Sequence, residues 1–245
     1  MTQTPARLAT WYFRGEVRGL EHIPDSGPAL LASMHSGVIA MPDAPVLFDG
    51  LLRRFGSQRP IHVLAHDGWR LIQAAIPGAR LARKLGVLAA NRDNARAALR
   101  AGSVLLVFPG GEYDQFRPIW QANTVDFGGR TGFLRIAYEE DVPLIPVVHV
   151  GSHETSISLS RGESLVRMLR IDRPPFRVSA LPVVLPQLIP FPAKITIEAL
   201  PPIDLRAQFP ADDEPDYSVM YAEVMKIMQA AVDKLAAERR FPILG

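Results

Sequence analysis

Apolar and polar positions follow two different periods along the first two thirds of the chain. Short apolar runs, bounded by glycine, proline or polar residues, predict buried strands at 28–35, 61–66, 85–90, 103–111 and 142–151. Apolar residues three and four positions apart predict helices at 44–56, 69–83, 92–102 and 131–141. Strands that alternate with helices at this pitch favour an α/β fold, with a largely parallel central sheet flanked by helices.

The alternation of strand and helix patterns ends after residue 155. Residues 161–177 carry five arginines and two acidic residues, and 179–193 are apolar but contain four prolines, which rule out a regular membrane helix. Residues 193–205 alternate like a strand, and 217–240 predict a long amphipathic helix whose apolar stripe is best explained by core packing. No window holds eighteen uninterrupted apolar residues, so we expect no helix that spans a membrane.

Length and composition fit a single domain over residues 1–245. We divide it into a core at 11–155, a membrane- or acyl-facing segment at 156–205 and a C-terminal amphipathic helix at 214–240. The chain has no cysteine, which excludes disulfides and cysteine-bound metals and allows a cytosolic face. A net charge of +2 is far from the balance of a nucleic-acid-binding protein, so no nucleic-acid partner is expected.

A histidine and an aspartate lie close together in the segment SMHSGVIAMPDAP, residues 33–45. A lone histidine such as His35 at a strand end is more often structural than catalytic. Asp43 is most simply explained as the N-cap of the following helix, but a carboxylate held there could also orient an imidazole. Ser36 is small and open to a ligand, and because no GxSxG elbow surrounds it, a serine hydrolase is poorly supported.

Charged and glycine-rich segments follow the next strands. Arg92 comes just after a strand at the start of a helix, which suits an anion but also suits an ordinary solvated side chain. A turn after the strand at 103–111 would let backbone N–H groups approach a ligand; it is formed by Phe108, Pro109, Gly110 and Gly111. Ligands of open α/β sheets bind at this end of the strands, where the chain also places Glu112, Arg117 and Arg130.

Two histidines four residues apart, His149 and His153, precede Glu154 and suggest a metal site. His149 belongs to an apolar strand, and the turn after it breaks any helical spacing, so we expect no metal here. His153 is instead a candidate to line the pocket of the acyl chain or the acceptor.

Together, four of these stretches resemble the glycerolipid acyltransferase superfamily, which includes the lysophosphatidate acyltransferases. That family has four ordered blocks, and this chain matches them with His35…Asp43, Gly86…Arg92, Phe108-Pro109-Gly110-Gly111 and Val142…Pro146. Seven residues rather than four separate the histidine from the aspartate, and Gly-Gly-Glu replaces Glu-Gly in the third block. Both departures resemble the branch related to monoacylglycerol and diacylglycerol acyltransferases.

The resemblance implies a glycerol-3-phosphate acyltransferase-like fold and an O-acyltransferase. The donor would be an acyl thioester, either acyl-CoA or an acyl carrier, and the acceptor a hydroxyl of lysophosphatidate or another lysophospholipid, or else of a neutral mono- or diacylglycerol. His35 would be the general base and Asp43 would orient it. Glu112 would bind a glycerol hydroxyl or fix an arginine. The implied substrate-binding residues are Ser36, Arg92, Phe108, Pro109, Gly110, Gly111, Glu112, Arg117, Arg130 and His153.

The resemblance implies no cofactor beyond acyl-CoA as a co-substrate, and no metal. It also implies a peripheral, monotopic enzyme on the cytoplasmic face of the cell membrane. Residues 161–193 are the candidate surface for an anionic bilayer, although they could equally pack over the sheet or on another subunit. A lipid or thioester hydrolase and a non-catalytic lipid-binding protein are the other functions that the sequence leaves open.

Overall fold

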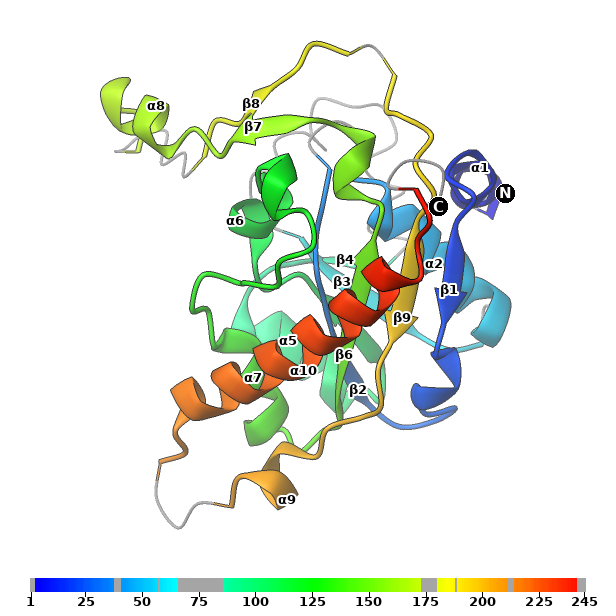
Figure 1. The fold of residues 1–245 in the computed structure, drawn as a ribbon. Coiled ribbons are helices and arrows are strands. Elements are labelled where there is room, and N and C mark those ends of the chain that lie inside the picture. The colour runs from blue at the N-terminus through cyan, green and yellow to red at the C-terminus, as the bar shows by residue number, and fades with distance from the viewer. Residues whose placement is uncertain are drawn as a thin grey trace.

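A seven-stranded sheet runs through the middle of the molecule (Figure 1). The computed structural model describes residues 3–37, 41–56, 58–65, 86–172, 180–187, 189–210 and 214–241. The strand order is β1-β9-β6-β2-β5-β3-β4, and all neighbouring strands are parallel except β6 and β9. The strands are β1 (Glu16–Arg18), β2 (Ala29–Ser33), β3 (Ile61–Ala65), β4 (Val87–Ala89), β5 (Val104–Val107), β6 (Leu144–Val150) and β9 (Thr196–Ala199). This confirms the predicted α/β fold with a largely parallel sheet.

The central strand β2 shows why the apolar runs were easy to find. All five of its residues are buried, and Leu30 is in register with Leu105 on one neighbour and Leu144 on the other. A parallel strand covered on both faces needs apolar side chains at successive positions rather than at alternate ones. The continuous runs in the sequence are therefore the inner strands of the sheet.

Helices cover both faces of the sheet (Figure 1). One face carries Leu30 and Ala32 and packs against α5 (Arg92–Arg100), α7 (Gly132–Glu139) and α10 (Tyr217–Ala237). The other face carries Ala29 and Leu31 and packs against α1 (Gln3–Tyr12) and α2 (Asp43–Phe55). The apolar stripe of α10 is buried in the first layer, which confirms that this helix packs into the core; the stripe includes Met220, Val224, Met228, Val232 and Leu235.

Several shorter helices and strands lie outside the central sheet and its covering helices. Three are short α-helices, α6 (Gly111–Gln115), α8 (Glu163–Met168) and α9 (Leu205–Gln208), and three are 3-10 helices, η1 (Leu20–His22), η2 (Ile119–Gln121) and η3 (His153–Thr155). Two further strands, β7 (Ser158–Ser160) and β8 (Val183–Val184), form a separate antiparallel pair. Figure 1 shows this pair and α8 above the sheet, beyond the end of β6.

The structure refines several predicted elements. The helix predicted at 69–83 lies outside the described residues. The strand predicted within 193–205 is β9, which is part of the central sheet, so only the portion of 156–205 that precedes it is free to face a membrane. The sequence analysis did not find α1 and β1. Across the described ranges, no helix combines the length and the apolar content needed to cross a membrane.

Two valines on α10 allow a test of this packing. Val224 is 1% exposed in the core, whereas Val219 on the same helix is 54% exposed. We expect Val224→Ala to lower the free energy of unfolding by about 2 kcal/mol, because two buried methyl groups and their packing are lost. The same change at Val219 should alter it by less than about 0.5 kcal/mol. Urea unfolding of both variants measures the difference, and equal effects would contradict the placement of α10.

Candidate active site

His35 and Asp43 meet at the end of the central strand. His35 follows β2, and its Nδ1 lies 2.8 Å from Oδ2 of Asp43, the first residue of α2. The turn between them relies on Gly37, whose φ is +85° and where an added Cβ would lie 2.6 Å from Cδ of Pro42. A side chain at this position would be strained and crowded. Glycine therefore lets the chain bring the start of α2 back to the strand end.

The carboxylate of Asp43 is used differently from what the sequence predicted. Pro42, not Asp43, occupies the N-cap position of α2, and no side chain caps this helix. The prediction of Asp43 as an N-cap is therefore wrong. Its Oδ1 accepts instead from the hydroxyl of Ser36 at 3.4 Å, while Oδ2 faces His35. A carboxylate in the first turn is still favoured by the helix dipole, so the position suits a permanent negative charge.

The surroundings of His35 favour a charged or hydrogen-bonded imidazole. Burial lowers the pKa of the His35 ring, but the charge and hydrogen bond of Asp43, with a contribution from Asp114, outweigh burial and raise the pKa above its ordinary value. The ring packs on Phe108, with the ring centroids 4.4 Å apart. About 12% of the side chain remains exposed.

The sequence analysis missed Asp114, which holds the main chain of His35. Oδ2 of Asp114 accepts a hydrogen bond from the backbone N–H of His35 at 2.6 Å, and Oδ1 lies 2.6 Å from Nη2 of Arg117. Both side chains are fully buried. Burial raises the pKa of Asp114 to about 6, although Arg117 and the N–H of His35 favour its charged form. Arg117 follows Asp114 at the third position, a spacing that suits an ion pair. This spacing was the signal in the sequence that could have identified the pair.

The Phe-Pro-Gly-Gly turn leads from β5 into α6. Gly111 has a φ of +48°, and its N–H donates to the carbonyl oxygen of Phe108 at 3.1 Å, so it is already engaged within the turn. Nη1 of Arg130 donates to the carbonyl oxygen of Gly110 at 2.5 Å, and Nη2 lies 3.9 Å from Glu112. Glu112 thus lies beside an arginine, which is consistent with one of the two roles expected for it, that of fixing an arginine. Of the two glycine N–H groups, Gly110 stays the candidate donor to a substrate.

The three predicted phosphate-binding arginines lie in different settings. Arg117 is buried beneath the site, where its Nη2 also donates to the carbonyl oxygen of Asp126 at 2.9 Å. Arg130 is 45% exposed beside the glycine turn. Arg92 is exposed at the start of α5, after the edge strand β4, and the strand order places two strands between β4 and β2. Substrate binding by these arginines stays a prediction, and Arg117 is the one whose charge faces protein rather than solvent.

Two buried histidines lie at the end of β6. His149 and His153 have ring centroids 6.1 Å apart, and Nε2 of His153 has no hydrogen-bond partner. Burial lowers the pKa of His149 to about 4 and that of His153 well below its ordinary value, so both rings are neutral at physiological pH. Among the described residues, no group of three or more histidine, aspartate or glutamate side chains is arranged to hold a metal ion. The pocket-lining role of His153 stays a prediction.

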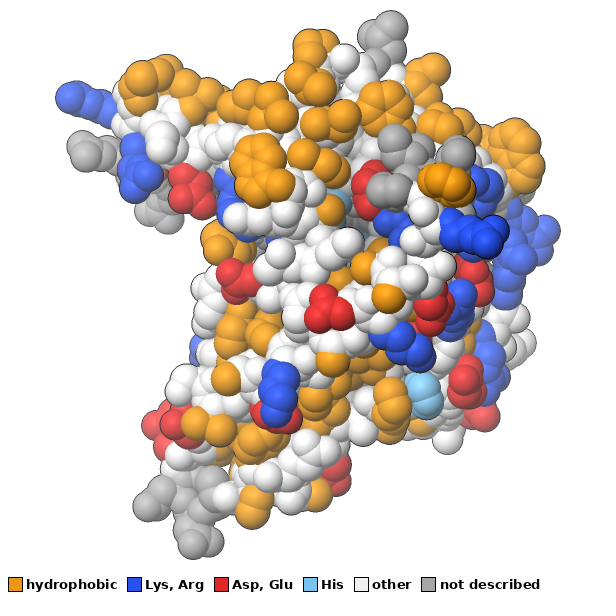
Figure 2. Space-filling view, in the orientation of Figure 1, with side chains coloured by type: hydrophobic (Ala, Val, Ile, Leu, Met, Phe, Trp, Pro, Cys, Tyr) orange, Lys and Arg blue, Asp and Glu red, His pale blue; other side chains and the backbone are white. Residues whose placement is uncertain are grey.

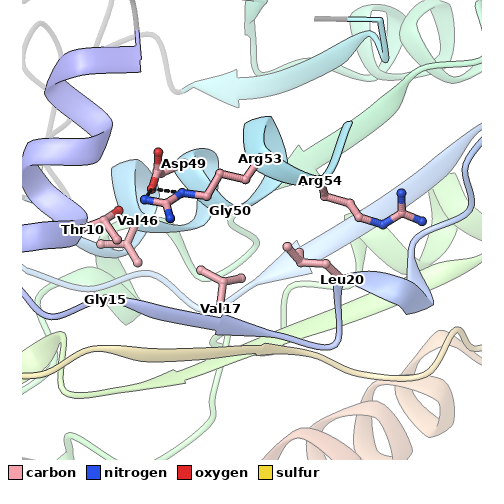
Figure 3. A pocket seen from close by; sticks show the side chains of 9 residues that line it. All are labelled: Thr10, Gly15, Val17, Leu20, Val46, Asp49, Gly50, Arg53 and Arg54. Atoms are coloured by element: carbon pink, nitrogen blue, oxygen red, sulfur yellow. Dashed lines mark hydrogen bonds and ion pairs between the residues drawn. The ribbon is translucent and has the colours of Figure 1, made fainter. Parts of the chain in front are cut away.

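A separate pocket of about 350 Å³ lies between α1, β1 and α2 (Figure 3). Its charged side chains are already paired, Arg53 with Asp49 at 2.7 Å and Arg54 with Asp25. None of the predicted site residues lines it; the lining consists of Thr10, Gly15, Val17, Leu20, Val46, Asp49, Gly50, Arg53 and Arg54. We assign it no chemistry.

Comparison with known proteins gives a consistent match. A family model described as Acyltransferase matches residues 14–150. An uncharacterized protein of Mycobacterium leprae is 29% identical over 245 aligned residues, which cover 96% of this chain and 63% of that protein. The human DGAT1/2-independent enzyme synthesizing storage lipids is 27% identical over 227 residues, covering 89% of this chain and 61% of its own. The chain thus spans less than two thirds of the length of either relative.

A solved structure shares the fold. It is that of the 1-acyl-sn-glycerophosphate (LPA) acyltransferase PlsC from Thermotoga maritima, which matches with a TM-score of 0.58 at 18% identity. The match covers 95% of this chain and 81% of the other. This confirms the expected architecture, and at this identity it speaks for the fold alone.

The His35–Asp43 pair can be tested by titration. We expect Asp43→Asn to lower the pKa of His35, because the carboxylate is what raises it above 6.5. The pair stabilises the fold fully below pH 6.5 and loses this effect as pH rises through the raised pKa. The variant should therefore be less stable than the parent by about 2 kcal/mol below pH 6.5, and by less at high pH.

Imidazole NMR signals and urea unfolding across pH measure both effects. Asp49→Asn is the matched control, since Asp49 is also buried on α2 but pairs with Arg53. An unchanged titration of His35 in Asp43→Asn would contradict the geometry.

Proposed function

Since the chain belongs to the acyltransferase family, we propose that it transfers a fatty acyl group from an acyl thioester to a hydroxyl of a glycerolipid. The observation that carries the proposal is the 2.8 Å contact between His35 and Asp43, at the end of the central strand. Ligands of open α/β sheets bind at the carboxyl ends of the strands, which is where this pair lies.

The geometry suits general-base catalysis by His35. When Nδ1–H of His35 donates a hydrogen bond to Asp43, Nε2 carries a lone pair that can accept the proton of the acceptor hydroxyl. His35 would take the hydroxyl proton as the oxygen attacks the thioester carbonyl carbon. The carbon–sulfur bond then breaks, and the imidazolium returns the proton to the thiolate. The N–H of Gly110 is the candidate donor to the oxyanion, and no acyl-enzyme forms because no protein nucleophile takes part.

The proposed acceptor is lysophosphatidate or another lysophospholipid, and the proposed donor is acyl-CoA or an acyl carrier. The support for a phosphorylated acceptor is the resemblance of the four sequence blocks to the lysophosphatidate acyltransferases. Arg92 and Arg130, both reachable from solvent, would contact phosphate groups of the acceptor or the donor. The proposed contacts of the glycerol hydroxyls and the acyl chain are Glu112 and His153. Ser36, which the sequence analysis expected to be open to a ligand, is fully buried and donates to Asp43, so it is not proposed as a contact.

A neutral mono- or diacylglycerol is the second candidate acceptor. The human relative named as synthesizing storage lipids matches 89% of this chain, which favours this possibility. The spacing of seven residues between His35 and Asp43 also resembles the branch that acts on neutral glycerides. An assay with both acceptor classes decides between them.

We expect His35→Ala to reduce acyl transfer by roughly 10²–10⁴-fold, because the general base is removed. Purified protein is incubated with a long-chain acyl-CoA and lysophosphatidate, lysophosphatidylcholine, monoacylglycerol or diacylglycerol, and products are quantified by mass spectrometry. His22→Ala is the matched control, since His22 bonds the carbonyl oxygen of Ala199 and lies outside the site.

Each outcome of this assay is informative. Equal transfer by His35→Ala and the parent would rule out the proposed mechanism. Fatty acid released without an acceptor would indicate a thioester hydrolase instead, and membrane binding without turnover would indicate a lipid-binding protein.

We also propose that the enzyme is peripheral, on the cytoplasmic face of the cell membrane. The β7–β8 pair and the chain after it present a set of exposed apolar side chains, which we call the apolar ridge: Leu159, Leu181, Val183, Leu185, Ile189 and Phe191. Residues 181, 183 and 185 share one face because side chains of an extended segment alternate. Figure 2 shows hydrophobic side chains gathered along this upper edge, with Lys and Arg at its flanks.

The position of the ridge suits delivery of a lipid to His35. The ridge lies beyond the end of β6, the same end of the sheet at which His35 follows β2 (Figure 1). Arg167 and Arg170 on and after α8 are exposed beside it and would face anionic headgroups. Leu8 and Trp11 on α1 are exposed too, and Figure 1 shows α1 at the same upper side.

Flotation on liposomes tests this surface. We expect binding to vesicles that contain anionic lipid, weakening as salt rises because the arginine contribution is screened. Replacing Leu181, Val183 and Leu185 with serine should weaken binding by about 100-fold, since each inserted side chain contributes roughly 1 kcal/mol. Val219→Ser is the control, because Val219 is exposed near the start of α10, and Figure 1 shows that end of the helix at the lower side of the molecule, away from β7 and β8. No flotation at low salt would exclude the proposed surface.

A further inference from the structure

We propose that Asp114 is a positioning residue for the reaction, which fixes His35 through its main-chain N–H while Arg117 fixes Asp114. The inference rests on the proposed function of His35 as general base. It assigns a purpose to a fully buried ion pair that touches neither solvent nor the reacting atoms.

The main chain of His35 lies just beyond the sheet. The N–H of Met34 donates to the carbonyl oxygen of Val147 on β6 at 3.1 Å, and this is where the strand contacts of β2 end. The next N–H, that of His35, donates to Asp114 at 2.6 Å. A hydrogen bond to a carboxylate is shorter and stronger than one to a neutral acceptor. Asp114 therefore holds the main chain of His35 in place, one residue beyond the last backbone hydrogen bond of β2 to the sheet.

The chain makes room for this carboxylate. Asp114 lies on α6, one turn after Gly110, and a Cβ added at Gly110 would lie only 2.3 Å from Cβ of Asp114. Because no side chain fits there, the glycine at 110 is what allows α6 to bring Asp114 close to the end of β2. Gly110 stands where the related family has glutamate, and a glutamate side chain there would collide with Asp114. The two features therefore depend on each other.

Stability alone is a poor explanation for the pair. Removing two charges from water costs several kcal/mol, and apolar replacements of buried ion pairs are often neutral or stabilising. Nε and Nη1 of Arg117 are buried without a hydrogen-bond partner, which adds to this cost. Arg117 still contacts Asp114 at 2.6 Å and the carbonyl oxygen of Asp126 at 2.9 Å. A role in holding the His35 main chain explains why so costly a pair is present.

The test uses a neutral double variant, Asp114→Asn with Arg117→Met, alongside the single Asp114→Asn. The double variant leaves no unpaired buried charge, so it keeps the test valid if the single variant does not fold. We expect kcat to fall by about 10- to 100-fold in both, with KM changed by less than about threefold, because a small displacement of the base slows chemistry more than binding.

The pH profile separates positioning from a general loss of structure. Within the part of the chain that the structure describes, the ionisable groups near His35 include Asp43 on α2, Asp114 on α6, and His149 and His153 at the end of β6, with Arg117 behind Asp114. Asp114 helps to raise the pKa of His35, so removing its charge should move the acid limb of kcat/KM to lower pH. Asp126→Asn is the control, because Asp126 accepts hydrogen bonds from Tyr113 and Tyr221 and does not contact His35. The acid limb of kcat/KM in this variant should lie at the parental pH.

Failure of the inference and failure of the proposed function are distinguishable. If His35→Ala keeps full activity, the proposed function fails. If His35→Ala is inactive while the folded neutral double variant keeps the parental kcat and acid limb, the positioning role of Asp114 is overturned. The proposed role of His35 as general base would then still stand.

Discussion

The site depends on one reversal of the chain, between a buried strand and a buried helix start. His35 is tied to the end of β2, and Asp43 opens α2, so both partners of the 2.8 Å contact are carried by elements that the core holds. Their separation in sequence matters less than the turn at Gly37, which returns the chain at a positive φ. A pair fixed in this way needs little reorganisation when a reactant arrives, which is the main requirement for a general base.

Buried polar groups beneath His35 support the pair. Asp114 and Arg117 occupy the space beneath His35, while His149 and His153 are held neutral by burial. Neutral imidazoles next to the base avoid repulsion when His35 takes up a proton. The Asp43 carboxylate then offsets the new charge, while the charge of Arg117 is already matched by Asp114.

The sequence predicted the parts of this arrangement that follow from local pattern. Buried strands such as β2 appear as continuous apolar runs, and the apolar stripe of α10 repeats with the period of a helix; a single sequence reveals both patterns. The edge strand β1 is only three residues long and half-buried, so it leaves no such pattern. Asp114 was missed because its role depends on a contact 79 residues away, and Asp43 was mistaken for a cap because its local context fits both roles. Long-range contacts of single side chains leave little trace in local spacing.

The antiparallel strand β9 has a consequence for how this protein can vary. Val150 at the end of β6 is in register with Thr196 at the start of β9, so everything from Gly151 to Ile195 departs from and returns to one point of the sheet. The entropic cost of closing such an excursion grows only slowly with its length. The exposed part of this excursion, around β7 and β8, can therefore be shortened or lengthened while the register of β6 with β9 is kept.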